Sequence, residues 1–273
     1  MSTVPSSDYR LHRRFDRIAR LVGESGMKTL SDSHVMVIGL GGVGSFAAEA
    51  LVRSGVGKVS LVDFDLVCVT NVNRQIQAVR GVVGKPKSTV LAERLRSINP
   101  QASIKSIPLF YEARTSDMLL KGKNCPDFVV DAIDNITAKC HLLARCKSLG
   151  LPVICSTGAS GRWDPTRVEI ADLSKSKVDP LASAVRKTLR KEYGFPSKGE
   201  WGIPAVFSTE PLQKPIVLPY DKNGDFQCVC PNGENTHHSC EERSLIWGTA
   251  GFVTGVFGMT CASVVVRELS AKA

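Results

Sequence analysis

Residues 34–63 read HVMVIGLGGVGSFAAEALVRSGVGKVSLVD and decide the fold class. They predict a strand over residues 34–38, a glycine-rich turn, a helix and a second strand that ends in Asp63. The first, third and sixth positions of the turn match the dinucleotide-binding pattern, and its glycines are Gly39, Gly41, Gly42 and Gly44. Glycines there permit a tight turn and close approach of a phosphate, and the helix N-terminus offers N–H groups to an anion. Asp63 is placed to hold a ribose hydroxyl.

Strand and helix patterns continue to alternate beyond this unit. Within this unit, the second strand is expected over residues 59–63 and the helix over residues 42–53. Beyond it, strands are expected over residues 103–107, 128–131 and 153–157, and helices over residues 87–98 and 137–149. This alternation predicts an α/β fold with a doubly wound, mostly parallel Rossmann-like sheet. Ligands of such sheets bind beyond the carboxyl ends of the strands. A basic amphipathic helix over residues 10–21 is expected to precede the sheet.

The composition is that of one globular domain with an anionic partner. Hydrophobic residues make up 43% and charged residues 22% of the 273 residues, and the formal net charge of +9 favours a partner such as nucleic acid. We expect residues 1–8 to be disordered, 9–160 to form a nucleotide-binding core, and 161–273 to form a substrate-binding, C-terminal elaboration. Nine cysteines without a disulfide framework indicate a reducing, cytoplasmic location.

An uncharged apolar run over residues 245–266 is long enough to span a bilayer. Four glycines interrupt it, and the N-terminus lacks the apolar region of a secretory signal. We therefore predict a buried core helix and no contact with a membrane.

Charged and amide side chains follow several of the predicted strands. They are Asp63, Asp65, Asn71, Arg74, Gln75, Lys87 and Asp134. Arg74 and Lys87 suit a triphosphate better than a pyrophosphate that backbone N–H groups already hold. Asp134 can bind Mg2+, which typically bridges one or two carboxylates to phosphate oxygens. Each residue alone could be a surface ion pair, a helix-start charge or an N-cap, but their joint occurrence at strand ends indicates chemistry.

Five of these motifs together resemble the E1-like, or ThiF/MoeB-like, adenylating superfamily: GLGGVG (39–44), DFD (63–65), NVNRQ (71–75), GKPK (84–87) and DAIDN (131–135). Five downstream motifs resemble its tRNA threonylcarbamoyladenosine dehydratase branch: TGASG (157–161), DPT (164–166), DL (172–173), DPL (179–181) and VFSTE (206–210). The likeness is weakest over residues 221–243.

The resemblance implies a homodimeric enzyme that uses ATP and Mg2+ to cyclise threonylcarbamoyladenosine in tRNA through an acyl adenylate. It also implies site residues: Asp63 for the ribose, Asn71, Arg74 and Lys87 for the phosphates, Asp134 for Mg2+, and Arg17 for the triphosphate of the partner subunit. With Asp65 and Gln75 nearby, the residues expected to be catalytic are Arg17, Arg74, Lys87 and Asp134. A monovalent cation and a sulfur-transfer protein are further candidates.

No cysteine is assigned to catalysis, because ring closure is intramolecular and needs no protein nucleophile. Relatives that activate ubiquitin-like or sulfur-carrier proteins commonly have two Cys-x-x-Cys pairs for Zn2+, and this chain has no Cys-x-x-Cys. A segment rich in potential ligands remains: Cys228, Cys230, His237, His238 and Cys240. Its spacing matches no metal motif, so zinc is not expected.

Residues 180–193 predict a helix with one apolar side and a basic side formed by Arg186, Lys187, Arg190 and Lys191. A charge run of this kind is often only a solvated face. In a basic protein whose expected substrate is tRNA, we assign the four side chains to contacts with the phosphate backbone.

Three alternatives stay open at this point. An activator of a ubiquitin-like or sulfur-carrier protein is disfavoured by the missing Cys-x-x-Cys pairs. An NAD-dependent oxidoreductase would share the glycine turn but would not need Arg74, Lys87 and Asp134. A non-catalytic nucleotide-binding tRNA chaperone would differ by having no turnover.

Overall fold

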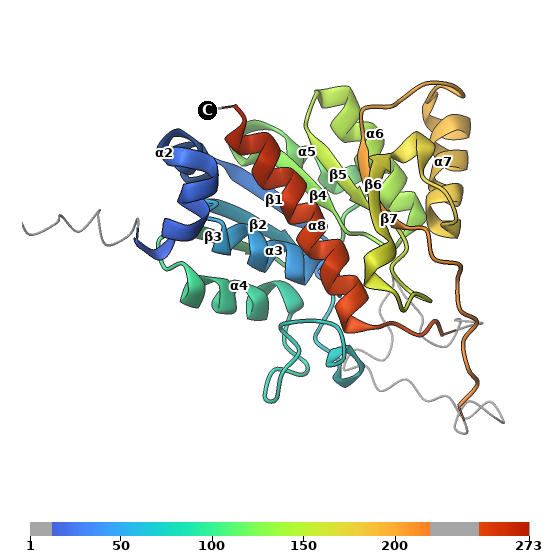
Figure 1. Ribbon diagram of the computed structural model, residues 1–273, viewed down its shortest axis with the longest axis horizontal. Helices are drawn as coiled ribbons and strands as arrows, with labels where there is room; N and C mark the ends of the chain where they lie inside the picture. The colour runs from blue at the N-terminus through green and yellow to red at the C-terminus, as the bar shows by residue number, and fades with distance from the viewer. Residues whose placement is uncertain (1–12, 219–245, 273) are drawn as a thin grey trace, which may run out of the picture.

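The computed structural model describes residues 13–218 and 246–272. One sheet of seven strands, in the order β3-β2-β1-β4-β5-β7-β6, runs through this part of the chain (Figure 1). All neighbouring strands pair in parallel except β6 and β7, which are antiparallel. The strands are β1 His34–Ile38, β2 Lys58–Val62, β3 Ser103–Ile107, β4 Phe128–Asp131, β5 Val153–Ser156, β6 Val168–Asp172 and β7 Pro204–Ser208. The predicted doubly wound, mostly parallel fold is confirmed.

Helices cover both faces of the sheet. They are α2 Asp16–Asp32, α3 Gly44–Arg53, α4 Lys87–Ile98, α5 Ala113–Leu120, α6 Ile136–Leu149, α7 Pro180–Tyr193 and α8 Gly251–Ser270. In β1, Val35 and Val37 pack in the core under α2, α3, α4 and α8, whereas Met36 and Ile38 pack in the core under α5, α6 and α7. Successive side chains of a strand point to opposite faces, so a strand buried on both faces is apolar throughout.

Helix α8 lies across α3 on one face of the sheet (Figure 1). By length and composition it could cross a membrane, but Val253, Phe257 and Val265 are fully buried in the core. Glycine permits this close packing, because a Cβ at Gly258 would lie 2.4 Å from the carbonyl oxygen of Val43. The predicted buried C-terminal helix is therefore present, although it begins and ends later than the apolar run suggested.

Several elements differ from the sequence prediction. Helix α2 continues to Asp32, well beyond the predicted end at residue 21, and it contains a kink at Gly23, where φ is 72°. Helix α5 and the antiparallel pair β6 and β7 were not predicted. Strands β6 and β7 belong to the region expected to be a C-terminal elaboration, yet they extend the same sheet. The expected disorder of residues 1–8 and the cysteine and histidine segment at 228–240 lie outside the described residues.

Candidate active site

The turn at residues 39–44, the glycine loop, connects β1 to α3. Gly39 has a φ of 89°, and a Cβ there would lie 2.5 Å from the carbonyl oxygen of Ala132. A Cβ at Gly44 would lie 1.8 Å from the carbonyl oxygen of Gly39. Both positions therefore require glycine for packing. A Cβ at Gly41 would meet nothing within 4 Å, so this position borders open space, where a ligand can approach the backbone.

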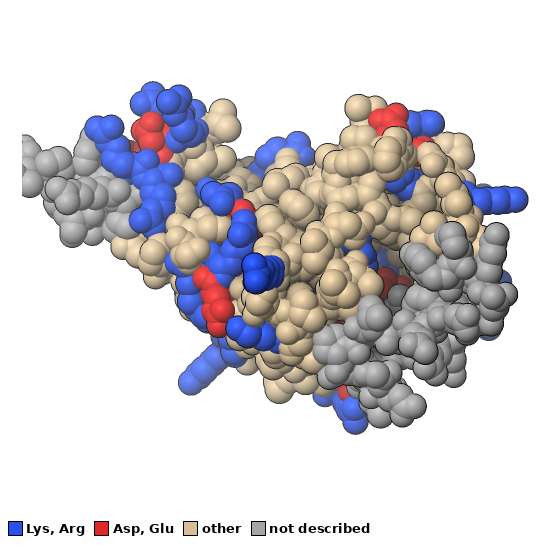
Figure 2. All heavy atoms as spheres, turned by 90° about the horizontal axis from the view of Figure 1, so that it is seen from below, with Lys and Arg blue, Asp and Glu red and all other residues tan. Residues whose placement is uncertain are grey.

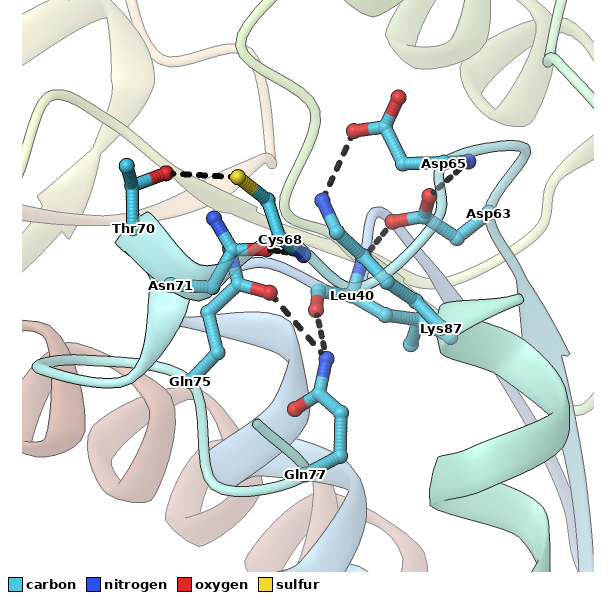
Figure 3. Close-up of polar contacts among 9 residues, drawn as sticks. All are labelled: Leu40, Asp63, Asp65, Cys68, Thr70, Asn71, Gln75, Gln77 and Lys87. Atoms are coloured by element: carbon cyan, nitrogen blue, oxygen red, sulfur yellow. Dashed lines mark hydrogen bonds and ion pairs between the residues drawn. The ribbon is translucent and has the colours of Figure 1, made fainter. Parts of the chain in front are cut away.

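Two side chains hold the peptide groups of Leu40 in the glycine loop (Figure 3). The backbone N–H of Leu40 donates to Asp63 Oδ2 at 2.6 Å, and Gln77 Nε2 donates to the carbonyl oxygen of Leu40 at 2.8 Å. Asp63 Oδ1 accepts from the backbone N–H of Asp65 at 2.8 Å. Burial raises the pKa of Asp63, and the charge of Lys87 counteracts part of that rise. Asp63 thus shapes the loop, beyond its expected contact with a ribose.

Gln77 did not emerge from the sequence, although its side chain is almost fully buried. It follows the Arg-Gln pair of the NVNRQ motif by two residues, and no pattern marks it. Its Nε2 lies 3.3 Å from Gln75 Oε1, so the buried Gln75 helps to hold it in place. Gln75 was expected to contact the nucleotide. In the structure it contacts Gln77, which holds the glycine loop.

Lys87 begins α4 and lies beside Asp65, with 2.8 Å between Lys87 Nζ and Asp65 Oδ2 (Figure 3). Its side chain is only 8% exposed. Burial lowers the pKa of Lys87, but the charges of Asp63, Asp65 and Asp134 outweigh that effect and raise it. Lys87 is therefore a protonated amine among three carboxylates. Two sequence-predicted strand ends and the GKPK motif meet here, as expected.

This cluster fits a magnesium ion that is shared with phosphates. Three carboxylates and one ammonium leave an excess of negative charge, which a divalent cation would offset. Asp134 is exposed and its carboxylate can reach a ligand. Among the described residues, no group of three His, Cys, Asp or Glu side chains could hold a metal alone. Mg2+ commonly uses one or two carboxylates and takes its other ligands from water and phosphate, so the exposed carboxylate of Asp134 is the residue that could hold it.

The NVNRQ motif follows a short 3-10 helix, η1 Val69–Asn71. Asn71 is buried, and its Oδ1 accepts from the backbone N–H of Cys68 at 2.9 Å (Figure 3). Arg74 donates from Nη1 to the carbonyl oxygen of Thr70 at 2.8 Å and to Asn73 Oδ1 at 2.9 Å. Asn73 in turn donates to the carbonyl oxygen of Thr249 at 2.8 Å. These contacts fix the segment against the N-terminal end of α8.

Arg17 is exposed on α2. A Cβ at Gly42 would lie 2.9 Å from the Thr254 hydroxyl, at the start of α8. A Cβ at Gly26 of α2 would lie 3.3 Å from the Cβ of Ser270, at the end of α8. Because an α-helix rises 1.5 Å per residue, roughly 24 Å separates these two contacts. The structure does not bring Arg17 to the site within one chain.

The basic side of α7 divides into two kinds of residue. Arg186 donates to the Ser176 hydroxyl, and burial lowers the pKa of Arg186. The guanidinium of Arg190 lies 5.3 Å from the centre of the Trp201 ring, which is a cation–π distance. Lys187 and Lys191 are exposed. The predicted strip therefore contains two exposed lysines and two arginines that also contact other side chains of the protein. Of these arginines, Arg190 is exposed and Arg186 is partly buried.

Acidic residues of the downstream motifs bind backbone N–H groups. Asp179 caps α7 through Ala182 N at 2.7 Å, and its other oxygen accepts from the Thr157 hydroxyl and from Gly158 N, both at 2.9 Å. The Glu210 carboxylate accepts from the backbone N–H groups of residues 163 and 164, each at 2.8 Å. These contacts join the loop after β5 to the start of α7 and the end of β7.

An apolar depression lies beside the glycine loop, where α8 begins. Its wall includes Phe46 of α3 and Phe252, Val256 and Met259 of α8. Phe252 is 51% and Met259 47% exposed. Trp163, which is also exposed, packs edge-on against Phe252 with 5.2 Å between ring centres.

Residues 15–273 match the model of the ThiF family. The tRNA threonylcarbamoyladenosine dehydratase of Haemophilus influenzae is 41% identical, over 99% of this chain and 98% of that protein. The enzyme of the same name from Bacillus subtilis is 44% identical over 95% of both chains. Among solved structures, Escherichia coli tRNA N6-threonylcarbamoyladenosine dehydratase, TcdA, in complex with AMP superposes with a TM-score of 0.82 at 37% identity, and 99% of each chain is covered. A complex of TcdA with ATP gives a TM-score of 0.81.

Proposed function

The chain belongs to the ThiF family, and we propose that it catalyses ATP-dependent dehydration of N6-threonylcarbamoyladenosine in tRNA to the cyclic form. The resemblance noted in the sequence is confirmed by this membership. The observation that carries the proposal is full-length similarity to three dehydratases, joined to a strand-end site with the residues for adenylation. An NAD-dependent oxidoreductase would leave the cluster of Lys87 with Asp63, Asp65 and Asp134 without a role.

ATP fits the edge where β1, β2 and β4 end. The backbone at Gly41 is open to a ligand, and the N-terminal N–H groups of α3 would donate hydrogen bonds to phosphate oxygens. Lys87, in place beside Asp65, contributes a fixed positive charge that stabilises negative charge developing on the phosphates. Hydrogen bonds from Arg74 Nη1 to Thr70 and Asn73 fix the orientation of the guanidinium, which would contact the phosphates. A bound Mg2+ would supply Lewis-acid stabilisation of the phosphates from Asp134.

The chemistry then proceeds in two displacement steps. A carboxylate oxygen of the threonyl group attacks the α-phosphate of ATP, forming a P–O bond and releasing pyrophosphate. A nitrogen of the same substrate attacks the activated carbonyl carbon, the C–O bond to the phosphate breaks, and AMP leaves with the former carboxylate oxygen. The net change is loss of one water from the nucleoside. Tethering of the nitrogen to the carbonyl supplies the orientational advantage of an intramolecular reaction.

The proposed enzyme works as a homodimer. The apolar depression at Phe46, Phe252, Val256 and Met259 is the kind of exposed patch that marks a protein contact. It adjoins the glycine loop, where α8 begins. The family resemblance implies that Arg17 of the second copy reaches the triphosphate bound here. Sedimentation equilibrium tests the dimer, and Phe252→Asp should shift it to monomer.

Mixing variants tests whether Arg17 acts across subunits. Arg17→Ala and Asp134→Ala chains should each be inactive alone. When mixed under conditions of subunit exchange, they should recover activity, because one site of the mixed dimer has both intact residues. If exchange is shown by a labelled subunit and no activity returns, Arg17 does not act in trans.

Basic surface beyond the ATP site would hold the tRNA backbone. Lys187 and Lys191 on α7 are the open positions, with Arg186 and Arg190 beside them. Lys and Arg side chains also gather over the α2 end of the molecule (Figure 2), where Arg13, Arg14, Arg17 and Arg20 are exposed. We assign residues 161–273 to substrate binding within one domain, and the enzyme to the cytoplasm. A monovalent cation and a sulfur-transfer partner complete the set of proposed associates.

Nucleoside analysis tests the activity directly. The protein is incubated with ATP, Mg2+ and tRNA bearing threonylcarbamoyladenosine, and the tRNA is then digested. Mass spectrometry should show the modified nucleoside lighter by one water. A control with Asp134→Ala should show the unchanged nucleoside. An unchanged mass with the wild-type protein, on tRNA that a known dehydratase converts, would contradict the proposal.

A further inference from the structure

Two ionic side chains lie fully inside the protein beneath the proposed site. Asp131 ends β4 and Lys139 lies in the first turns of α6, and both side chains are 0% exposed. Lys139 Nζ lies 2.7 Å from Asp131 Oδ2. Burial lowers the pKa of Lys139, but the charge of Asp131 outweighs that effect and raises it. Neither residue has a role in the steps proposed above.

Both members of the pair hold the backbone of one residue in the loop between them. This β4–α6 loop comprises residues 132–135. The backbone N–H of Ile133 donates to Asp131 Oδ1 at 3.1 Å, and Lys139 Nζ donates to the carbonyl oxygen of Ile133 at 2.8 Å. At the end of the loop, the Asn135 side chain caps α6 through Ala138 N at 3.0 Å. The peptide groups of Ile133 are thus fixed from both sides.

The same loop forms one wall of the active site. The carbonyl oxygen of Ala132 would be only 2.5 Å from a Cβ on Gly39, so the loop lies directly against the glycine loop. Asp134 is the next residue after Ile133, and its charge acts on both Lys87 and Lys139. A shift of Ile133 would therefore move Asp134 relative to the phosphates.

We propose that Lys139, paired with Asp131, is the positioning residue for Asp134: it holds the β4–α6 loop in the conformation that presents the Asp134 carboxylate to the nucleotide and its metal ion. This inference rests on the proposed function. A buried ion pair is a weak source of stability, because desolvation of two charges offsets their attraction. Apolar residues of similar volume often replace such pairs without loss of stability. Apolar residues could not make the hydrogen bonds to Ile133 that place Asp134, and this accounts for an ionic pair at these positions.

The test replaces the pair by Asp131→Leu with Lys139→Met, which fills the space but removes both hydrogen bonds to Ile133. Asp134→Ala is the reference, and Cys140→Ala is the matched control. Cys140 is also fully buried, and it is the next residue of α6, but its sulfur faces Val185 of α7. The readouts are thermal stability, kcat and the KM for ATP, and Mn2+ binding by electron paramagnetic resonance with a non-hydrolysable ATP analogue.

The double variant should fold, lose about 10- to 100-fold in kcat and in Mn2+ affinity, and keep its KM for ATP within about threefold, as expected for loss of a support behind a metal ligand. Cys140→Ala should match the wild type in kcat and Mn2+ affinity. Wild-type Mn2+ affinity and kcat in the double variant, with Asp134→Ala inactive, would overturn the role of Lys139 alone. Wild-type turnover by Asp134→Ala would instead contradict the proposed function of that carboxylate.

A second measurement needs no variant and covers the case in which the double variant does not fold. Hydrogen exchange of the wild-type protein should show the amide of Ile133 exchanging as slowly as the amides of β4, because it donates to a buried carboxylate. Exchange as fast as at exposed turn residues such as Arg80 would overturn the proposal.

Discussion

The two halves of the sheet use their charged side chains in opposite ways. At the ends of β1, β2 and β4, Lys87 lies among Asp63, Asp65 and Asp134, and the exposed Asp134 faces outward. At the ends of β5 and β7, the carboxylates accept hydrogen bonds from the protein's own backbone; they are Asp164, Asp179 and Glu210. The charged groups of the first half are arranged for a ligand, whereas the carboxylates of the second half stabilise the protein's own loops.

This difference shows that an acidic motif at a strand end can either bind a ligand or hold the backbone of the protein itself. The two Asp-Pro motifs were assigned in the sequence only as part of the resemblance to the dehydratase branch, and in the structure Asp164 caps η3 Pro165–Arg167 and Asp179 caps α7. They build the loops of the substrate side. Chemistry at this edge therefore comes from the nucleotide half, and changes in the two halves should separate into effects on turnover and effects on stability.

Removal of the Asp134 carboxylate should give the largest effect of all the variants, a loss of kcat with little change in stability. Asp134→Ala should abolish detectable adenylation, because loss of one electrostatic partner of a transition state lowers kcat by at least about 10²- to 10³-fold. Its melting temperature should stay within a few degrees of wild type, because the side chain is exposed. AMP release in single-turnover experiments and calorimetry measure the two quantities. A large loss of stability would show that the nucleotide half is also structural.

Removal of Asp179 should give the opposite pattern. Asp179→Ala leaves the start of α7 uncapped and the partly buried N–H of Gly158 unpaired, while the Thr157 hydroxyl keeps the carbonyl oxygen of Val206 as its acceptor, so unfolding should become easier by about 2–3 kcal/mol. The matched control, Asp164→Ala, removes the more exposed cap and should destabilise the protein less than Asp179→Ala. Urea unfolding measures both. Activity per folded molecule should stay within about threefold of wild type, and a hundredfold loss would place Asp179 in the chemistry.

The basic side of α7 should affect tRNA binding but not ATP binding. Lys187→Gln with Lys191→Gln should reduce the slope of log affinity against log salt by about 0.7–0.9 for each lost phosphate contact. Arg186→Gln with Arg190→Gln should change the slope less, because these side chains already contact Ser176 and Trp201. Filter binding at several salt concentrations gives the slopes. Equal slopes for the wild type and the lysine variant would mean that α7 only contacts solvent.

The smallest expected effect concerns the pH dependence of stability. Burial raises the pKa of Asp172, but hydrogen bonds from Ser174, Trp201 and Ile203 outweigh it and lower the pKa below its ordinary value. Its stabilising contribution is therefore present above about pH 4 and is lost as the pH falls through the lower folded pKa. Asp172→Asn should flatten the acid side of the stability curve by less than about 1 kcal/mol, since water screens a partly exposed group.

Asp63 provides the contrast in the other half of the sheet. Burial raises its pKa, so its contribution to stability is complete below the unfolded pKa and is lost as the pH rises through the folded value. Asp63→Asn should therefore make stability rise more steeply with pH, opposite in sign to Asp172→Asn. Denaturant titrations between pH 3 and about 6 compare the two variants. Slopes of the same sign would show that the two carboxylates do not differ as described.

Local patterns were enough to predict the regular elements of the nucleotide half. The strand over residues 34–38 is a short continuous apolar run before a glycine turn, the helix after it has a period-3.6 apolar pattern, and the structure has both within two residues. Strand β6 was missed because Val168–Asp172 is half exposed and mixed in polarity. Strand β7 is buried and apolar, and residues 206–208 were recognised only as part of a family motif, with no strand assigned to them.

The site residues divide for a similar reason. Asp65, Lys87 and Asp134 follow strands or begin helices, so topology alone places them together. Gln77 and the pair of Asp131 with Lys139 act through backbone groups that only the folded chain brings near. Arg17 was predicted to act on a partner's nucleotide, and its place at the far end of α8 is compatible with that role without testing it.

Oxygen tracing tests the central claim most directly. The threonyl carboxylate of the tRNA-borne nucleoside is labelled with 18O, and the protein converts it in one turnover with unlabelled ATP and Mg2+. Attack of a carboxylate oxygen on the α-phosphate predicts AMP that carries one 18O atom, unlabelled pyrophosphate, and a cyclised nucleoside that keeps the second 18O atom in its ring carbonyl. Recovery of the label in inorganic phosphate with ADP as the product, or in water with AMP unlabelled, would contradict an acyl-adenylate mechanism at this site.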